Sequence, residues 1–289
     1  MRAPPRLPTF ALVDAHVHVH PCFDDATFLD SSAANFQRGA AQVGVPEPYA
    51  GCLLLAEAGE TRWFRRRREG GQGRSGDWTF EPTEEDCSIT ARHTSGERLF
   101  LIAGRQVATR EGIEALALGR DVEIPDGLAL AETLDRIRAA EALPVLPWGF
   151  GKWWLRRGSL VEETFRKRGS EELFLGDNGG RLGGRLGIAA APRLFREARS
   201  QGVPVLPGSD PLPLAEHCAR AGSYGLVLSG PLDEAHPAAC VLRGIRRLKG
   251  QPRSYGRCAD LTSFLRDQAA LRWRRRLTAG VKTPAEAMP

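Results

Sequence analysis

Short, continuous apolar runs recur along this chain and alternate with segments of helical periodicity. The apolar runs cover residues 10–19, 51–57, 99–107, 143–148, 173–177, 204–210 and 224–228. Helical patterns cover residues 130–137, 192–200, 214–221 and 260–277. Continuous apolar runs are typical of strands buried on both faces of a parallel sheet, and strand–helix alternation favours such a sheet. The sequence therefore predicts an α/β fold with a parallel sheet, open or closed.

The length and composition are those of a globular protein. With 289 residues, of which 42% are hydrophobic, the chain is long enough for one α/β barrel or two smaller domains. We expect a single domain over residues 1–280. Within it, residues 65–86 are rich in Arg, Gly, Ser and Glu and are expected to form a flexible surface excursion. Residues 281–289 are expected to be a frayed tail.

The formal net charge is +5, and arginine is concentrated at residues 65–68 and 272–276. A basic balance can indicate a nucleic-acid or phosphate partner. Nucleic acid is not the favoured partner here, because few aromatic side chains are interleaved with the arginines. Solvated arginine on surface helices is the simpler interpretation of both runs.

The cysteine pattern and the apolar runs bear on the cellular location. The six cysteines are scattered and include no Cys-x-x-Cys pair, which argues against a zinc knuckle or a redox motif. The first residues lack the pattern of a signal peptide, and no run approaches the roughly 18 apolar residues of a membrane span. We therefore expect a cytoplasmic protein with reduced thiols and no membrane partner.

Three histidines, His16, His18 and His20, occupy alternate positions at the end of the first apolar run. Side chains on a strand alternate between its two faces, so these three are expected to point the same way. Imidazole is the commonest protein ligand for zinc and similar metals. Half of the chain's six histidines lie within these five residues. The pattern favours a metal site over the alternative, an ordinary strand with solvated histidines.

Further polar residues follow the later strands, where the loops of a parallel fold converge on one crevice. They are Glu57, Gln106, Lys152, Asp177, Asn178, Ser209 and Asp210. Carboxylates and a lysine together with imidazoles indicate a hydrolytic metal site, in which the metal polarises an oxyanion and activates water. Lys152 and Arg181 are candidates for binding an anionic substrate. Packing at the rim and a tight turn are the alternative roles of their two segments.

Residues 13–18 (VDAHVH), 99–119, 130–148 and 207–225 follow one another as four motifs of a known family do. The first resembles an Asp-x-His-x-His motif, and the second a Gly-x-Glu strand with the segment after it. The third resembles an element that ends in His-Pro, and the fourth a Gly-Ser-Asp-x-His motif. Together they resemble the polymerase-and-histidinol-phosphatase (PHP) family of metal-dependent phosphoesterases. The resemblance implies a distorted (β/α)7 TIM-like barrel that holds up to three metal ions.

Several ligands of that family are replaced in this chain. Gln106 stands where the family has a glutamate, and Trp148 and Leu212 stand where it has histidines. A full set of three metal ions is therefore not expected. The resemblance instead implies a reduced site for a divalent ion, zinc or manganese, with one ion in place of three or with none.

The reduced site has a definite set of candidate residues. The implied metal ligands are His16, His18 and Asp210, with Asp24 and Glu57 as replacement ligands. The candidate catalytic residues are Lys152, Asp177 and Arg181. The implied reaction is hydrolysis of a small anionic substrate, a phosphate ester.

Two other functions stay open. A barrel with a degenerate site can be a catalytically inactive module that binds a ligand or a partner. The amidohydrolase superfamily also opens with His-x-His and closes with an aspartate on its last strand, which would make the chain a metal-dependent hydrolase of amides. Its middle histidines have no clear counterpart here, because His93, His217 and His236 are expected to be structural or exposed.

Overall fold

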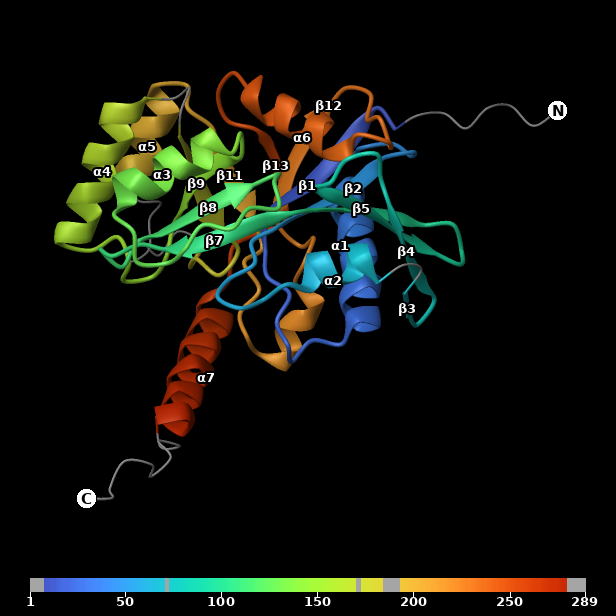
Figure 1. The fold of residues 1–289 in the computed structure, drawn as a ribbon, viewed down its shortest axis with the longest axis horizontal. Helices are drawn as coiled ribbons and strands as arrows, with labels where there is room; N and C mark the ends of the chain where they lie inside the picture. The colour runs from blue at the N-terminus through green and yellow to red at the C-terminus, as the bar shows by residue number, and fades with distance from the viewer. Residues whose placement is uncertain (1–7, 71–72, 170–172, 184–192, 280–289) are drawn as a thin grey trace.

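The computed structural model describes residues 8–70, 73–169, 173–183 and 193–279 and is drawn in Figure 1. Its strands form two sheets. The larger sheet has the order β13-β12-β1-β2-β6-β5-β4-β3. Its strands are β1 (Phe10–Val17), β2 (Ala50–Leu55), β3 (Arg74–Ser75), β4 (Trp78–Pro82), β5 (Ser88–His93), β6 (Arg98–Ile102), β12 (Gly225–Ser229) and β13 (Arg253–Tyr255). The smaller sheet has the order β11-β10-β9-β8-β7. Its strands are β7 (Gly104–Ala108), β8 (Glu114–Leu118), β9 (Leu143–Pro147), β10 (Phe174–Asn178) and β11 (Val205–Gly208).

The strand directions are mixed, and the predicted (β/α)7 TIM-like barrel is wrong. In the larger sheet, β1, β2 and β6 are parallel, whereas β12, β13 and the β3–β6 meander pair antiparallel. In the smaller sheet, β9, β10 and β11 are parallel, whereas β7 and β8 pair antiparallel. The described strands thus make two open sheets. Apolar runs predict that strands are buried, but the direction of pairing depends on connections that such runs do not specify.

The helices cover different parts of the two sheets. They are α1 (Asp25–Val43), α2 (Trp63–Glu69), α3 (Leu130–Ala139), α4 (Arg156–Arg168), α5 (Arg193–Ser200), α6 (Pro237–Arg246) and α7 (Leu261–Ala279), with a 3-10 turn η1 (Ala215–Ala219). Figure 1 shows α3, α4 and α5 grouped beside the smaller sheet and α1 and α2 beside the larger one. Helix α7 extends away from both. Within the described residues, no helix is both long and apolar enough to cross a membrane.

The buried hydrophobic residues form two cores. The larger core joins β1, β2, β4–β6 and β12 to α1 and α6, with Phe28, Phe36 and Tyr255 among its buried rings. It also takes in residues of β8–β11 in the smaller sheet. The smaller core joins β8–β11 to α3, α4 and α5, where Phe165 and Phe195 are buried. Burying such side chains is the main favourable term in folding, so the larger core stabilises the packing of the two sheets on each other.

The apolar run at 99–107, expected to be one strand, is divided between the two sheets. Strand β6 ends at Ile102, and β7 begins at Gly104 on the other sheet. A Cβ atom at Gly104 would lie 2.2 Å from the carbonyl oxygen of Leu55 and 2.9 Å from that of Ala117. Only glycine fits where two backbones approach so closely. Gly104 therefore permits the crossing from one sheet to the other.

Regular structure extends into the segment 65–86, where we expected a flexible excursion. It contains most of α2, both strands β3 and β4, and ends in the loop before β5. Several of its arginines are paired as well, among them Arg65 with Asp121 and Glu123, and Arg68 with Asp86. Strands β3 and β4 thus form one edge of the larger sheet. The predicted tail at 281–289 lies outside the described residues.

Candidate metal site

Three side chains converge where the two sheets meet. His16 lies in β1, His18 follows directly after that strand, and Asp210 follows β11. The Nε2 atoms of His16 and His18 are 3.0 Å apart. One carboxylate oxygen of Asp210 lies 3.6 Å from Nε2 of His16 and 3.5 Å from Nε2 of His18. These three atoms could contact one shared cation.

The backbone explains why the three groups meet. Alternation along an extended chain places His16 and His18 on the same side. A Cβ atom at Gly208 would lie 2.5 Å from both Cβ and the backbone nitrogen of His16, so glycine allows β11 to approach β1. The N–H of Asp210 then donates to the carbonyl of His16 at 2.9 Å. Asp210 has φ of 47°, a left-handed conformation that is uncommon for a residue other than glycine and is typical of functional sites.

Asp14 holds the two sides of the site together. Its fully buried carboxylate accepts N–H groups from His16 at 3.2 Å, from Ser209 at 2.8 Å and from Gly222 at 2.8 Å. These donors come from β1 and from two loops on either side of η1. Burial raises the pKa of Asp14 to about 6, although the hydrogen bonds from Ser209, Gly222 and His16 favour its charged form. Asp14 therefore acts as a structural acceptor beneath the cluster.

The local electrostatics keep the imidazole of His18 neutral. Burial lowers the pKa of His18 to about 3, and the neighbouring His16 adds to this effect, whereas Asp210 opposes it. Burial alone would raise the pKa of Asp210, but His16, His18 and Lys152 outweigh it, so that this pKa is lowered. A neutral imidazole and a charged carboxylate are the forms that bind a metal.

The third histidine of the run, His20, stays outside the cluster. Its Nε2 lies 2.9 Å from the carbonyl oxygen of Pro211, and its ring stacks on that of His18 with centroids 5.4 Å apart. His20 also lines a cavity of about 520 Å³ with Trp63, Arg66 and other residues. His20 therefore contacts both the cluster, through His18, and the cavity.

The two predicted replacement ligands, Asp24 and Glu57, cap helices instead. Asp24 accepts the backbone N–H of Thr27 at 2.9 Å and its hydroxyl at 2.7 Å, which is the geometry of an N-cap for α1. Glu57 is buried and accepts the N–H of Phe64 at 2.8 Å in the first turn of α2. Neither residue belongs to the described group that could hold a cation.

The predicted catalytic residues are engaged with partners inside the protein. Asp177 and Arg181 form a two-pronged ion pair, with Oδ1 2.6 Å from Nε and Oδ2 2.8 Å from a terminal nitrogen. The hydroxyl of Tyr224 donates to the same carboxylate at 3.0 Å. Lys152 pairs with Glu114 and lies close enough to Asp210 to lower its pKa. Of these three candidates, Lys152 is thus linked electrostatically to the cluster.

Glu114 and the structural role of Asp14 were not predicted. A charged residue inside an otherwise apolar run is the signal that could have indicated the role of Asp14, because such a group must find hydrogen-bond partners when buried. No local signal pairs Glu114 in β8 with Lys152 after β9, since the contact depends on the order of strands in the smaller sheet.

Comparisons with known proteins give a fold and no family. No family model matches the sequence, and no curated protein matches it. Among solved structures, the chain is similar to PsfC from Pseudomonas syringae PB-5123, with a TM-score of 0.52. The sequence identity is 12%, and the match covers 93% of this chain and 99% of that chain. At this identity the likeness concerns the fold alone, so the PHP resemblance stays a prediction.

Proposed function

We propose that this protein is a metal-dependent hydrolase of a phosphate ester, with one zinc or manganese ion bound by His16, His18 and Asp210. The observation that carries the proposal is the convergence of two imidazole nitrogens and a carboxylate oxygen on one point. Catalytic zinc sites characteristically have three protein ligands and an open fourth position. The bound ion would supply Lewis acidity for polarising a phosphoryl oxygen and activating water.

The surrounding side chains suit an anionic substrate. The cavity next to His20 has Arg66 and Arg67 on its wall. Arg67 is paired with Asp25, whereas the exposed Arg66 has no ion-pair partner among the described residues. A phosphate seated there would face Arg66 and the imidazole of His20. Lys152 would add positive charge on the side of Asp210.

Metal analysis tests the proposal. The protein is stripped with EDTA, dialysed against zinc, manganese or iron(II), and its metal content is measured. We expect about one zinc or manganese ion per chain in the wild type. His16→Ala/His18→Ala should lose most of the metal. His236→Ala is the matched control, because His236 pairs with Asp233 and Glu84 and does not belong to the cluster.

Activity assays then separate the functions. The zinc- and manganese-loaded proteins should hydrolyse p-nitrophenyl phosphate or its diester, and the double variant should not. A wild-type protein that binds none of these metals would contradict the proposal and leave a binding module. Hydrolysis of amides without hydrolysis of phosphate esters would instead select an amidohydrolase. Iron is included because two histidines and one carboxylate are also the ligands of non-haem Fe(II) oxygenases.

A further inference from the structure

A second, larger cavity lies at the other end of β1. It has a volume of about 770 Å³, and Ala11 at the start of that strand contributes to its wall. Ala11 and His16 are five residues apart, which corresponds to about 17 Å along an extended strand. The cavity is therefore separate from the candidate metal site.

The floor of this cavity is aliphatic. It is formed by residues of β12 and α6 and by the turns that follow them, among them Val227, Leu228, Val241 and Leu248. Among the residues that the structure describes, no aromatic side chain belongs to its wall, so they offer no ring on which a nucleobase could stack. A flexible aliphatic chain is the apolar group that such a floor suits.

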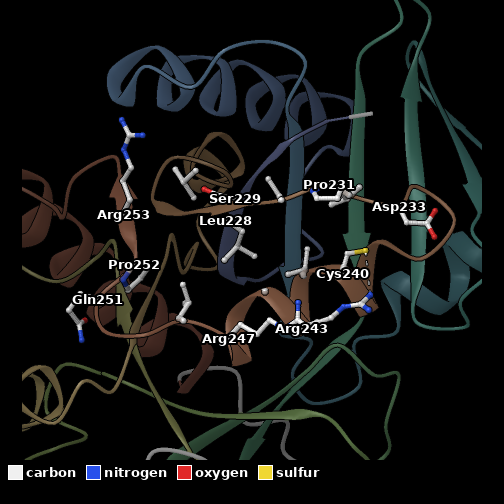
Figure 2. A pocket seen from close by; sticks show the side chains of 17 residues that line it. Leu228, Ser229, Pro231, Asp233, Cys240, Arg243, Arg247, Gln251, Pro252 and Arg253 are labelled. Carbon is white, nitrogen blue, oxygen red and sulfur yellow. Dashed lines mark hydrogen bonds between the residues drawn. The ribbon is translucent and has the colours of Figure 1, made fainter. Parts of the chain in front are cut away.

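The rim of the cavity is positively charged. Figure 2 shows Arg243 of α6 and Arg247, the residue directly after that helix, on one side, with Arg253 of β13 on the opposite side. Arg253 is held by the carbonyl of Val43, and Arg243 contacts the sulfur of Cys240 at 3.8 Å. The exposed Arg247 has no side-chain partner among the described residues.

One acidic residue, Asp233, also lies on this wall, and His236, Ala235 and Arg243 all lower its pKa. Its carboxylate accepts hydrogen bonds from the ring of His236 at 2.9 Å and from the backbone N–H of Ala235 at 3.0 Å. Its single negative charge is outnumbered by the positive charges of Arg243, Arg247 and Arg253 on the same wall. Arg243 in the last turn of α6 and Arg247 at its C-cap are four positions apart, a spacing at which like charges repel one another. The helix C-terminus favours single cations, but it does not account for an aliphatic cavity of this size beside them.

We propose that this cavity binds a small amphiphilic anion, consisting of a phosphate or phosphonate head on an aliphatic chain. The guanidinium groups of Arg243 and Arg247 would bind the head, because their planar sets of N–H donors match phosphate oxygens. The aliphatic chain of the ligand would cover Val227, Leu228 and Leu248. The proposal does not depend on the metal site.

Titration calorimetry with octylphosphonate tests this inference. This probe has no ester bond to hydrolyse, and EDTA is present throughout, so a metal site cannot contribute. We expect one molecule bound per chain, with at least a tenfold loss of affinity in Arg243→Ala/Arg247→Ala. Arg196→Ala/Arg199→Ala is the matched control, because it removes the same charge from exposed positions on α5. It should bind like the wild type.

Two further ligands test the contributions of the anionic head and of the aliphatic chain to the affinity separately. Inorganic phosphate and octyltrimethylammonium should each bind at least tenfold more weakly than octylphosphonate. Equal binding by the Arg243/Arg247 variant, or by the ammonium probe, would overturn the proposal. Arg247→Glu provides a second variant that keeps a long polar side chain and reverses its charge. Its binding must also fall while its thermal unfolding stays close to that of the wild type.

Discussion

Two buried polar clusters lie close together in this protein and differ in how their charges are balanced. In the first, Arg181 and Tyr224 donate hydrogen bonds to the carboxylate of Asp177, so that the buried anion is balanced by a cation. In the second, the Nε2 atoms of His16 and His18 face each other and a carboxylate oxygen of Asp210. These are three potential hydrogen-bond acceptors with fewer N–H donors between them. A cluster that is complete by itself has a structural role. A cluster with surplus acceptors is suited to a cation, as in the proposed metal site.

Breaking the Asp177–Arg181 pair is expected to have the largest effect on stability. Arg181→Met leaves the buried carboxylate of Asp177 without its main partner, and removing one member of such a pair costs about 3–5 kcal/mol. Urea unfolding at pH 7 measures the loss. Asp177→Asn/Arg181→Met should recover part of it, because no buried charge then remains. A stable Arg181→Met protein without activity would instead restore the predicted catalytic role of Arg181.

Adding a cation should stabilise the second cluster. A ligand that binds only the folded state adds about 2.7 kcal/mol at a concentration 100 times its Kd. We therefore expect zinc or manganese to raise the midpoint of thermal unfolding of the EDTA-treated wild type. Asp210→Asn should show a much smaller shift, since it loses the charged ligand. If the metal raises both midpoints equally, it binds elsewhere and the two clusters do not differ in the proposed way.

Local sequence patterns predicted parts of the fold and of the site. Alternation along an apolar strand brought His16 and His18 together, because strand periodicity is a local property. The position of Asp210 was inferred from strand ends and from the PHP resemblance, and the structure places it beside both imidazoles. The sheet topology was not predictable in this way: one apolar run, 99–107, serves two sheets because of the contacts at Gly104.

From the sequence alone, a carboxylate can be interpreted as a metal ligand or as a helix cap. This ambiguity explains why the predicted roles of two further residues differ from those in the structure. Asp24 and Glu57 both come shortly before helices, and their oxygens accept backbone N–H groups there. Helix α1, for which Asp24 is the N-cap, was not among the predicted helices. Without that helix, the capping role of Asp24 could be considered but not assigned. Likewise, the partner of Asp177 is only four residues away, yet the pair was interpreted as two separate groups.

The charge balance of Asp14 is intermediate between those of the two clusters, because backbone N–H groups alone balance this anion. Asp14→Asn would turn an amide NH₂ toward one of the three backbone donors. We expect a loss of about 1–3 kcal/mol in urea unfolding at pH 7, the usual cost of an unsatisfied buried group. Asp126→Asn is the control, since the exposed Asp126 accepts a single N–H, from Ala108. Similar losses in the two variants would contradict the structural role of Asp14.

A third buried cluster, His217 with Arg220 and Asp267, is complete like the first but contains a titrating ring. Nδ1 of His217 accepts the N–H of Leu212 at 2.9 Å, so Nε2 carries the proton that faces Asp267 at 3.2 Å. Burial lowers the pKa of His217 below 6.5, and Arg220 lowers it further, although Asp267 and Glu216 oppose them.

The direction of this shift sets the smallest expected effect. Below pH 6.5 the unfolded chain takes up a proton that folded His217 does not, so the free energy of unfolding falls as the pH falls. His217→Gln cannot titrate, while Arg220, Asp267 and Glu216 remain in place. Between pH 7.5 and pH 5.5 the wild type should lose stability relative to this variant by about 1 kcal/mol, as measured by urea unfolding. A relative gain would mean that the ring is protonated in the folded protein. The cluster would then contain a second cation beside Arg220, and the distinction between complete and incomplete clusters would need a different basis.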